Sequence, residues 1–116
     1  MSGLLDRIMD KLADVVNNLK PSTMFSVGTK TSDNIAITAN GYHYGTMSAS
    51  NPGYYPLGIV GRYLQYVSGA QGRVNIYELE LISRSSGSCE VAYSLQNLVS
   101  SAVTTKIRVY ILWAKE

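Results

Sequence analysis

The stretch that most constrains the fold is residues 53–67, GYYPLGIVGRYLQYV. From Leu57 onward, apolar residues occupy both sets of alternating positions: Leu57, Ile59, Tyr63 and Val67 on one face, and Val60, Leu64 and Tyr66 on the other. A strand that is apolar on both faces is usually covered on both faces. In a chain of only 116 residues, we expect the second cover to come from a neighbouring subunit. The glycines within the run, Gly58 and Gly61, indicate a bulge or a close backbone approach.

The composition excludes several classes of protein. Only 16% of the residues are charged, and the ten Lys and Arg residues are scattered singly, so we expect no nucleic-acid partner. The single cysteine, Cys89, rules out an intrachain disulfide and gives no zinc-ligand spacing. We therefore expect no metal and no cofactor. Because charges interrupt every long apolar window, we also expect no signal peptide and no membrane insertion.

Residues 1–20 are predicted to form an N-terminal oligomerisation helix. Its apolar seam has the coiled-coil spacing of three and four residues and consists of Leu5, Ile8, Leu12, Val15 and Leu19. The β-branched Ile8 and Val15 favour three or four strands, whereas a second frame through Met9 and Val16 favours a dimer. Two alternatives stay open: an amphipathic helix that lies on its own domain, and a helix that lies on a membrane surface.

Residues 21–116 are predicted to form a separate β domain. Pro21 ends the helix, and the helical period is absent after it. Strand patterns occur at residues 24–27, 34–39, 57–67, 73–82, 89–95 and 103–113. A change of parity within 73–82 indicates a β-bulge. In the last strand, one face carries Val103, Thr105, Ile107, Val109, Ile111 and Trp113. Six to eight strands without a helix between them predict an antiparallel, jelly-roll-like β-sandwich.

Residues 40–56 are interpreted as a long loop, with a short strand possible through 44–47. Tyr42, His43, Tyr44, Tyr54 and Tyr55 flank this small-residue segment and form the candidate ligand-binding site. Tyrosine offers a flat apolar face and a hydroxyl, and Ser, Gly and Asn offer adaptable hydrogen bonds. The alternative is that these rings pack the ends of the sandwich or a subunit interface. The tyrosines within predicted strands, including Tyr63 and Tyr77, are expected in the core or an interface.

No set of catalytic residues stands out. Glu78 and Glu80 share a strand face at about 6.6 to 7 Å, a spacing that a carboxylate pair could use, but alternating Glu is also the ordinary polar face of a strand. His43 has no second histidine to share a metal and no marked nucleophile to activate. We therefore expect a protein that is not an enzyme.

The order of these elements resembles bacteriophage appendage proteins. A short heptad helix, a linker that begins with Pro21, and a Tyr/Gly/Ser-rich β domain are followed by a long amphipathic strand. The segments 55–61 (YPLGIVG) and 106–113 (KIRVYILW) are similar to the β modules of small tail-fibre, head-fibre and baseplate proteins. The resemblance implies a homotrimer, a virion-proximal helix, other virion proteins as partners, and a β head that recognises the host. The chain departs from the family in having almost no shaft.

The expected function is therefore a non-enzymatic viral appendage module that binds a host surface glycan or protein as a symmetric oligomer, most simply a trimer. Its expected location is the virion, assembled in the host cytoplasm. The main alternative is a purely structural capsid or tail decoration or fibre protein whose tyrosines only pack. A distant third is a carbohydrate-active enzyme that uses Glu78 and Glu80.

Overall fold

The structure, a computed structural model, describes residues 2–18, 24–69 and 71–116, with helix side chains described for residues 3–12. The described residues form a helix, α1 (Ser2–Asn18), and the strands β1 (Phe25–Thr31), β2 (Ile35–Ile37), β3 (Tyr42–Ser50), β4 (Tyr54–Ser68), β5 (Val74–Ser85), β6 (Ser88–Asn97) and β7 (Val103–Lys115). All strand pairs are antiparallel. The expectation of a mainly β fold after one short N-terminal helix is confirmed.

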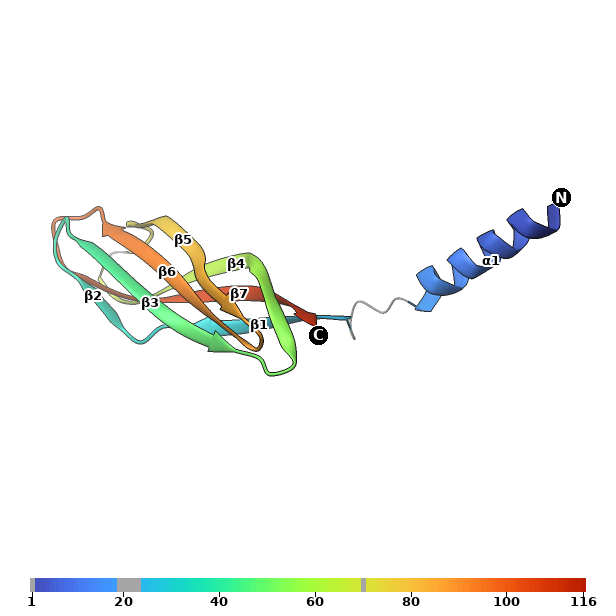
Figure 1. Ribbon diagram of the computed structural model, residues 1–116. Coiled ribbons are helices and arrows are strands. Elements are labelled where there is room, and N and C mark those ends of the chain that lie inside the picture. Colours follow the sequence, from blue (N-terminus) through green and yellow to red (C-terminus); the bar gives the residue numbers. More distant parts are fainter. Residues whose placement is uncertain (1, 19–23, 70) are drawn as a thin grey trace.

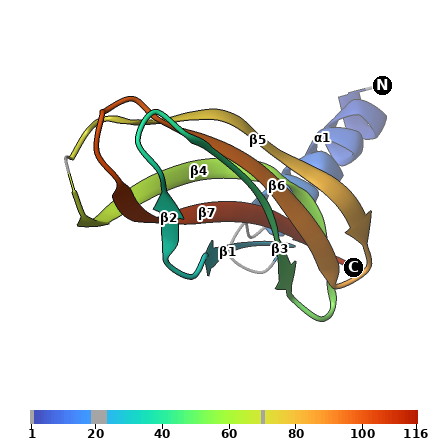
Figure 2. The ribbon, with the colours of Figure 1, turned by 90° about the vertical axis from the view of Figure 1, so that its left-hand side faces the viewer.

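The strands form two sheets, each built around one central strand (Figures 1 and 2). In sheet A, β7 pairs with β1 and β2 along one side and with β4 along the other. In sheet B, β6 lies between β3 and β5. The chain passes from β1 and β2 in sheet A to β3 in sheet B, returns to sheet A as β4, and then forms β5 and β6 before it ends in β7.

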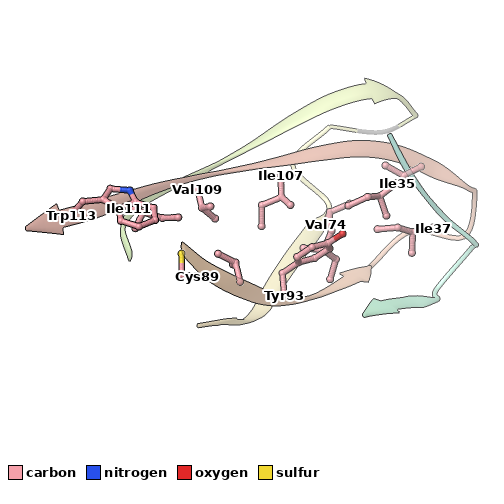
Figure 3. Close-up of a cluster of buried hydrophobic side chains, with 12 residues drawn as sticks. Ile35, Ile37, Val74, Cys89, Tyr93, Ile107, Val109, Ile111 and Trp113 are labelled. Atoms are coloured by element: carbon pink, nitrogen blue, oxygen red, sulfur yellow. The ribbon is translucent and has the colours of Figure 1, made fainter. Parts of the chain in front are cut away.

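The apolar core lies between the two sheets, where β7 faces β6 (Figure 3). Along β7, buried and half-buried residues alternate from Val103 to Ala114. The buried set is the one predicted from the sequence, and it ends at Trp113, whose side chain is 1% exposed. Alternation is clean here because every second side chain of an extended chain points to the same face.

The central strand of sheet B is more deeply buried than predicted. Cys89, Val91 and Leu95 face the core, as the sequence indicated. However, Ala92 and Ser94 on the opposite face are also buried, at 0% and 1% exposed. The prediction of a half-buried strand is therefore wrong over these residues. Their side chains are short, and the larger residues of β3 and β5 on either side cover them.

β4 is long and irregular. Its pairing with β7 shifts between Pro56 and Gly58, between Ile59 and Gly61, and between Tyr66 and Ser68, so the bulges expected at the two glycines are confirmed. Each bulge adds a residue and changes the parity, which makes the predicted division of its faces wrong. The core side carries Ile59, Leu64 and Tyr66, and the outer side carries Leu57, Val60, Tyr63 and Val67, which are 41–56% exposed.

Residues 42–50 form a full strand rather than part of a long loop. β3 pairs with β6 from Tyr42 opposite Gln96 to Ser50 opposite Ser88. Gly45, within this strand, has a packing role. A Cβ at Gly45 would collide with the ring and hydroxyl of Tyr93, which occupies the space beneath it. A turn leads into β3 from Thr38 to Gly41, closed by a hydrogen bond from the Gly41 N–H to the Thr38 carbonyl at 2.9 Å, and Asn40 within it has a positive φ of 54°.

α1 extends away from the strands (Figure 1), within a molecule that measures 75 × 25 × 19 Å. The side chains of Leu5, Ile8 and Leu12 are each more than half exposed. The other two residues of the predicted seam, the side chain of Val15 and residue Leu19, lie outside the described part of the chain. The helix is confirmed, while its self-association stays a prediction. No helix among the described residues combines the length and apolar character needed to cross a membrane.

Candidate functional site

The five residues of the predicted binding loop do not form one cluster. Tyr42, His43 and Tyr44 begin β3 in sheet B, while Tyr54 and Tyr55 begin β4 in sheet A. Only Asn51–Gly53 separate the two strands, so the predicted loop is mostly strand. The first group lies at the start of β3 and the second lies beyond its end. Since a strand rises about 3.4 Å per residue, the length of β3 places the two groups at opposite ends of the domain.

Tyr54 and Tyr55 have different surroundings from Tyr42 and Tyr44. Tyr54 packs against the buried core. Tyr55 is 39% exposed and lies opposite Ala114 on the outer side of sheet A. For Tyr54, the structure agrees with the alternative of a ring that packs the end of the domain. Its role in ligand binding stays a prediction.

Tyr42 and Tyr44 do share a surface, and a third tyrosine joins them. They project from the outer side of β3 and are 66% and 62% exposed. The ring of Tyr77, on β5, meets the ring of Tyr42 edge to face, with 5.8 Å between centroids and an interplanar angle of 89°. We call these residues, Tyr42, Tyr44 and Tyr77, the tyrosine face.

The Tyr42–Tyr77 contact passes over the central strand of sheet B. β3 and β5 both pair with β6, so their backbones are about 9 to 10 Å apart and only long side chains can meet above it. The residue of β6 opposite Tyr42 is Gln96, and the short side chain of Ser94 is the next one on the same face. The sequence placed Tyr77 in the core or an interface. The bulge between Ile76 and Glu78 turns it outward, 51% exposed, so it lies outside the core, and its place in an interface stays a prediction.

A carboxylate and exposed hydroxyls border the tyrosine face. Ser94 Oγ donates to Glu78 Oε2 at 3.4 Å, which holds the half-buried carboxylate beside the rings. Thr46 and Ser48 continue the outer side of β3 and are exposed. At the outward positions of sheet B, the described residues include Glu78, Glu80 and Glu90 and no Lys or Arg. The surface therefore combines flat apolar rings, hydroxyl groups and negative charge.

His43 points to the other side of β3, into a groove between sheets A and B. Its ring stacks on Tyr93 at 5.9 Å with an interplanar angle of 20°. This part of the groove holds about 400 Å³ and is lined by Lys30, Asp33, Asn34, His43 and Tyr93, among others. A further 420 Å³ follows along β1 over Ile111 and Trp113. His43 is thus a half-buried strand residue rather than an exposed loop residue.

The groove beside His43 is lined mainly by polar side chains. Burial raises the pKa of the Tyr93 hydroxyl, and the carboxylate of Asp33 raises it further. Tyr93 therefore stays protonated. Among the described residues, no three His, Cys, Asp or Glu side chains gather in a way that could hold a metal ion.

Glu78 and Glu80 lie on one side of β5, as predicted, opposite Ser94 and Ala92. Neither lines the two parts of the groove. Both belong to the outer side of sheet B, where Glu78 is half-buried and Glu80 is exposed.

Comparisons of the chain with protein-family models, with curated proteins and with solved structures found no match. Function therefore has to be inferred from the geometry of the tyrosine face, the groove and the exposed apolar surfaces.

Proposed function

We propose that this chain is a non-enzymatic binding module of a viral appendage that attaches to a host surface glycan or protein as a symmetric oligomer. In this proposal the two sheets form a jelly-roll-like β-sandwich head, and α1 contributes a coiled-coil contact between copies, most simply in a trimer. The virion is its place of action, and other virion proteins are its partners.

The tyrosine face is the observation that carries the proposal. Three exposed aromatic rings gather on the two strands that flank β6, and these strands hold them in a fixed arrangement. Exposed aromatic surface of this kind is typical of an interaction site, because covering it removes apolar surface from water. A sugar ring can stack its apolar face on tyrosine while its hydroxyl groups bond to neighbouring polar side chains. The charge at the outward positions of sheet B favours a neutral or cationic ligand over an anionic one.

A single tyrosine face would bind weakly. Each aromatic contact contributes about 0.5 to 1.5 kcal/mol beyond its buried area, and the face is open rather than enclosed. Several copies that engage several ligands at once would bind far more tightly, because linked sites raise the effective concentration. Weak sites on a symmetric oligomer suit attachment to a repetitive surface.

Binding of the purified full chain to a glycan array, before and after a double Tyr42→Ala and Tyr77→Ala substitution, tests the proposal. Ile82→Ala is the matched control, because Ile82 is 47% exposed and lies on β5 but outside the tyrosine face. We expect the double variant to lose at least about tenfold in affinity for any glycan that the wild type binds, which corresponds to about 1.4 kcal/mol. Equal binding by the folded double variant would contradict the proposal.

The main competing function is a purely structural decoration or fibre protein. The exposed apolar residues of α1 and of sheet A favour it, since they suit contacts within a particle. A folded wild-type chain that assembles but binds no glycan or host protein would support this role. Hydrolysis of a bound glycan that is lost on Glu78→Gln would instead support the carbohydrate-active enzyme.

A further inference from the structure

The outer side of sheet A carries an apolar surface at the end of the domain where the chain arrives from α1. Phe25 and Val27 at the start of β1 lie opposite Ala114 and Leu112 of β7. On the other side of β7, Leu112 lies opposite Gly58 of β4. The backbone register therefore places outward residues of three strands side by side. We call Phe25, Val27, Leu57, Val60 and Leu112 the apolar face.

The bulges of β4 widen this surface. Leu57 and Val60 are the residues that the register shifts leave without a partner on β7, and they are 41% and 56% exposed. Gly58 and Gly61, which follow them, have no side chain that would project from the surface. A Cβ at Gly61 would come within 3.1 Å of the Tyr110 ring, so glycine allows that ring to lie against β4. The result is a broad, nearly flat apolar area.

The area is large for an uncovered surface. Phe25, Val27, Leu57 and Val60 are 39–57% exposed, and Tyr55 and Tyr63 at the edges are 39% and 54% exposed. With roughly 150 to 250 Å² for each large side chain, this corresponds to on the order of 500 Å², more than half of the ~800 Å² that each partner buries in a specific complex. The apolar stripe of α1 adds further exposed surface of the same kind.

We propose that the apolar face packs against the apolar faces of other copies of this chain, gathered around the symmetry axis of the oligomer. Another copy is favoured as the cover of the apolar face because the chain exposes two apolar surfaces that are close in sequence. One is the stripe of α1, before residues 19–23, and the other is the start of β1, after them. Association of α1 between copies brings the nearby ends of the domains together at high effective concentration. The inference rests on the oligomeric part of the proposed function and not on its glycan.

The charges on sheet A agree with contact at the α1 end. At the outward positions of β7, Arg108 lies opposite Thr31 at the end of β1, and Lys106 lies beyond it. Arg108 is held in place by Tyr63, whose ring is 5.9 Å from the guanidinium, and by Thr31, which accepts a hydrogen bond at 3.2 Å. When copies meet through Phe25, Val27 and Leu57, the positive charges of Arg108 and Lys106 lie outside the centre of the contact, so they are not buried against one another.

Sedimentation velocity of the full chain tests the interface. The double variant Val27→Lys, Val60→Lys adds two charges to the apolar face, and Asn75→Lys, Ser83→Lys adds the same charge to exposed positions of sheet B. We expect the wild type and the control to share one oligomeric mass. The apolar-face variant should raise the dissociation constant by more than about tenfold, because charges buried without partners are costly in an interface.

A monomeric wild type at high micromolar concentration, or an unchanged constant in the apolar-face variant, would overturn the inference. Glycan binding by a dissociated but folded variant would separate this interface from the proposed ligand site. Hydroxyl-radical footprinting of the wild type gives a reading that does not depend on variant folding. Phe25 and Leu57 should gain protection as concentration rises, while Tyr44 should not. Protection that persists at concentrations where sedimentation shows only monomer would identify α1 of the same chain as the cover, and would overturn the proposal.

Discussion

The two sheets share one core but differ on their outer sides. In sheet A, the central strand β7 alternates strictly, with long half-buried side chains such as Arg108 and Tyr110 on the outside. In sheet B, the outer side of the central strand β6 carries the short side chains of Ala92 and Ser94 between Glu90 and Gln96, and two tyrosines of the flanking strands meet across it. The outer side of a sheet is therefore shaped as much by the neighbours of the central strand as by that strand itself.

This difference separates two kinds of surface. Sheet A exposes an apolar area with cations at one end, and sheet B exposes tyrosines, hydroxyl groups and carboxylates. An extended apolar area is best covered by an equally apolar partner, whereas aromatic rings among polar groups suit a ligand that is itself amphipathic. We therefore assign self-association to sheet A and ligand binding to sheet B as separate proposals.

The largest effect should come from the core that both sheets share. Trp113→Ala should lower the free energy of unfolding by about 3 to 5 kcal/mol, because a fully buried ring leaves a cavity. Lys106→Ala, at a half-buried outward position of the same strand, should change it by less than about 0.5 kcal/mol. Chemical denaturation measures both. Similar small changes in the two variants would mean that the inner and outer sides of β7 are assigned incorrectly.

A smaller effect should distinguish two glycines, one on each sheet. Gly45→Ala in β3 should destabilise the fold by about 1 to 3 kcal/mol, because a Cβ there meets the side chain of Tyr93. Gly58→Ala in β4 is the matched control, since a Cβ at that position has no neighbour within 4 Å. Thermal or chemical unfolding measures the pair. A well-tolerated Gly45→Ala would show that Tyr93 does not occupy the space beneath β3.

The pair of rings across β6 should contribute a still smaller, measurable coupling. In a double-mutant cycle of Tyr42→Ala and Tyr77→Ala, we expect a coupling free energy of about 0.5 to 1.5 kcal/mol, at the lower end because both rings are partly in water. The same cycle with Tyr44 in place of Tyr42 serves as the control. No coupling between Tyr42 and Tyr77 would remove the contact that distinguishes the outer side of sheet B.

The smallest effect concerns pH. Burial raises the pKa of the Cys89 thiol above its ordinary value of 9.0, and the charge of Arg84 lowers it by less. Below that ordinary value, both folded and unfolded thiols are neutral. As the pH rises through it, the unfolded thiol ionises first, so the free energy of unfolding should fall. Cys89→Ala should reduce this slope between pH 8 and about 10.5 in denaturation experiments. An identical slope in both proteins would contradict it.

The strands with strong periodicity could be predicted from the sequence. From Val103 to Ile111, β7 alternates β-branched residues with more polar ones, and Trp113 continues the inner set, so its inner side could be assigned correctly. The bulges near Gly58 and Gly61 could be expected because glycine weakens a regular strand. The exact residue that a bulge adds could not, since parity alone does not show which of two neighbours turns outward. For this reason Leu57, which is exposed, was grouped with Ile59, which packs on the core.

The candidate site was harder to predict because its residues depend on contacts between strands. Gly, Asn and Ser around Tyr42 and Tyr44 are typical of a loop, yet pairing with β6 and the space needed by Tyr93 make the segment a strand. Two of the proposed five residues lie on the tyrosine face. Tyr77 joins them only because β3 and β5 flank the same strand, β6. The order of the strands along the sequence does not reveal this arrangement.

The separation of the two surfaces is tested most directly by sedimentation velocity of two double variants at the same concentration. Val27→Lys, Val60→Lys alters sheet A, and Tyr42→Ala, Tyr77→Ala alters sheet B. We predict that the first variant sediments as a smaller species than the wild type and that the second retains the wild-type mass. A loss of mass in the tyrosine variant, with the lysine variant unchanged, would contradict the assignment of self-association to sheet A.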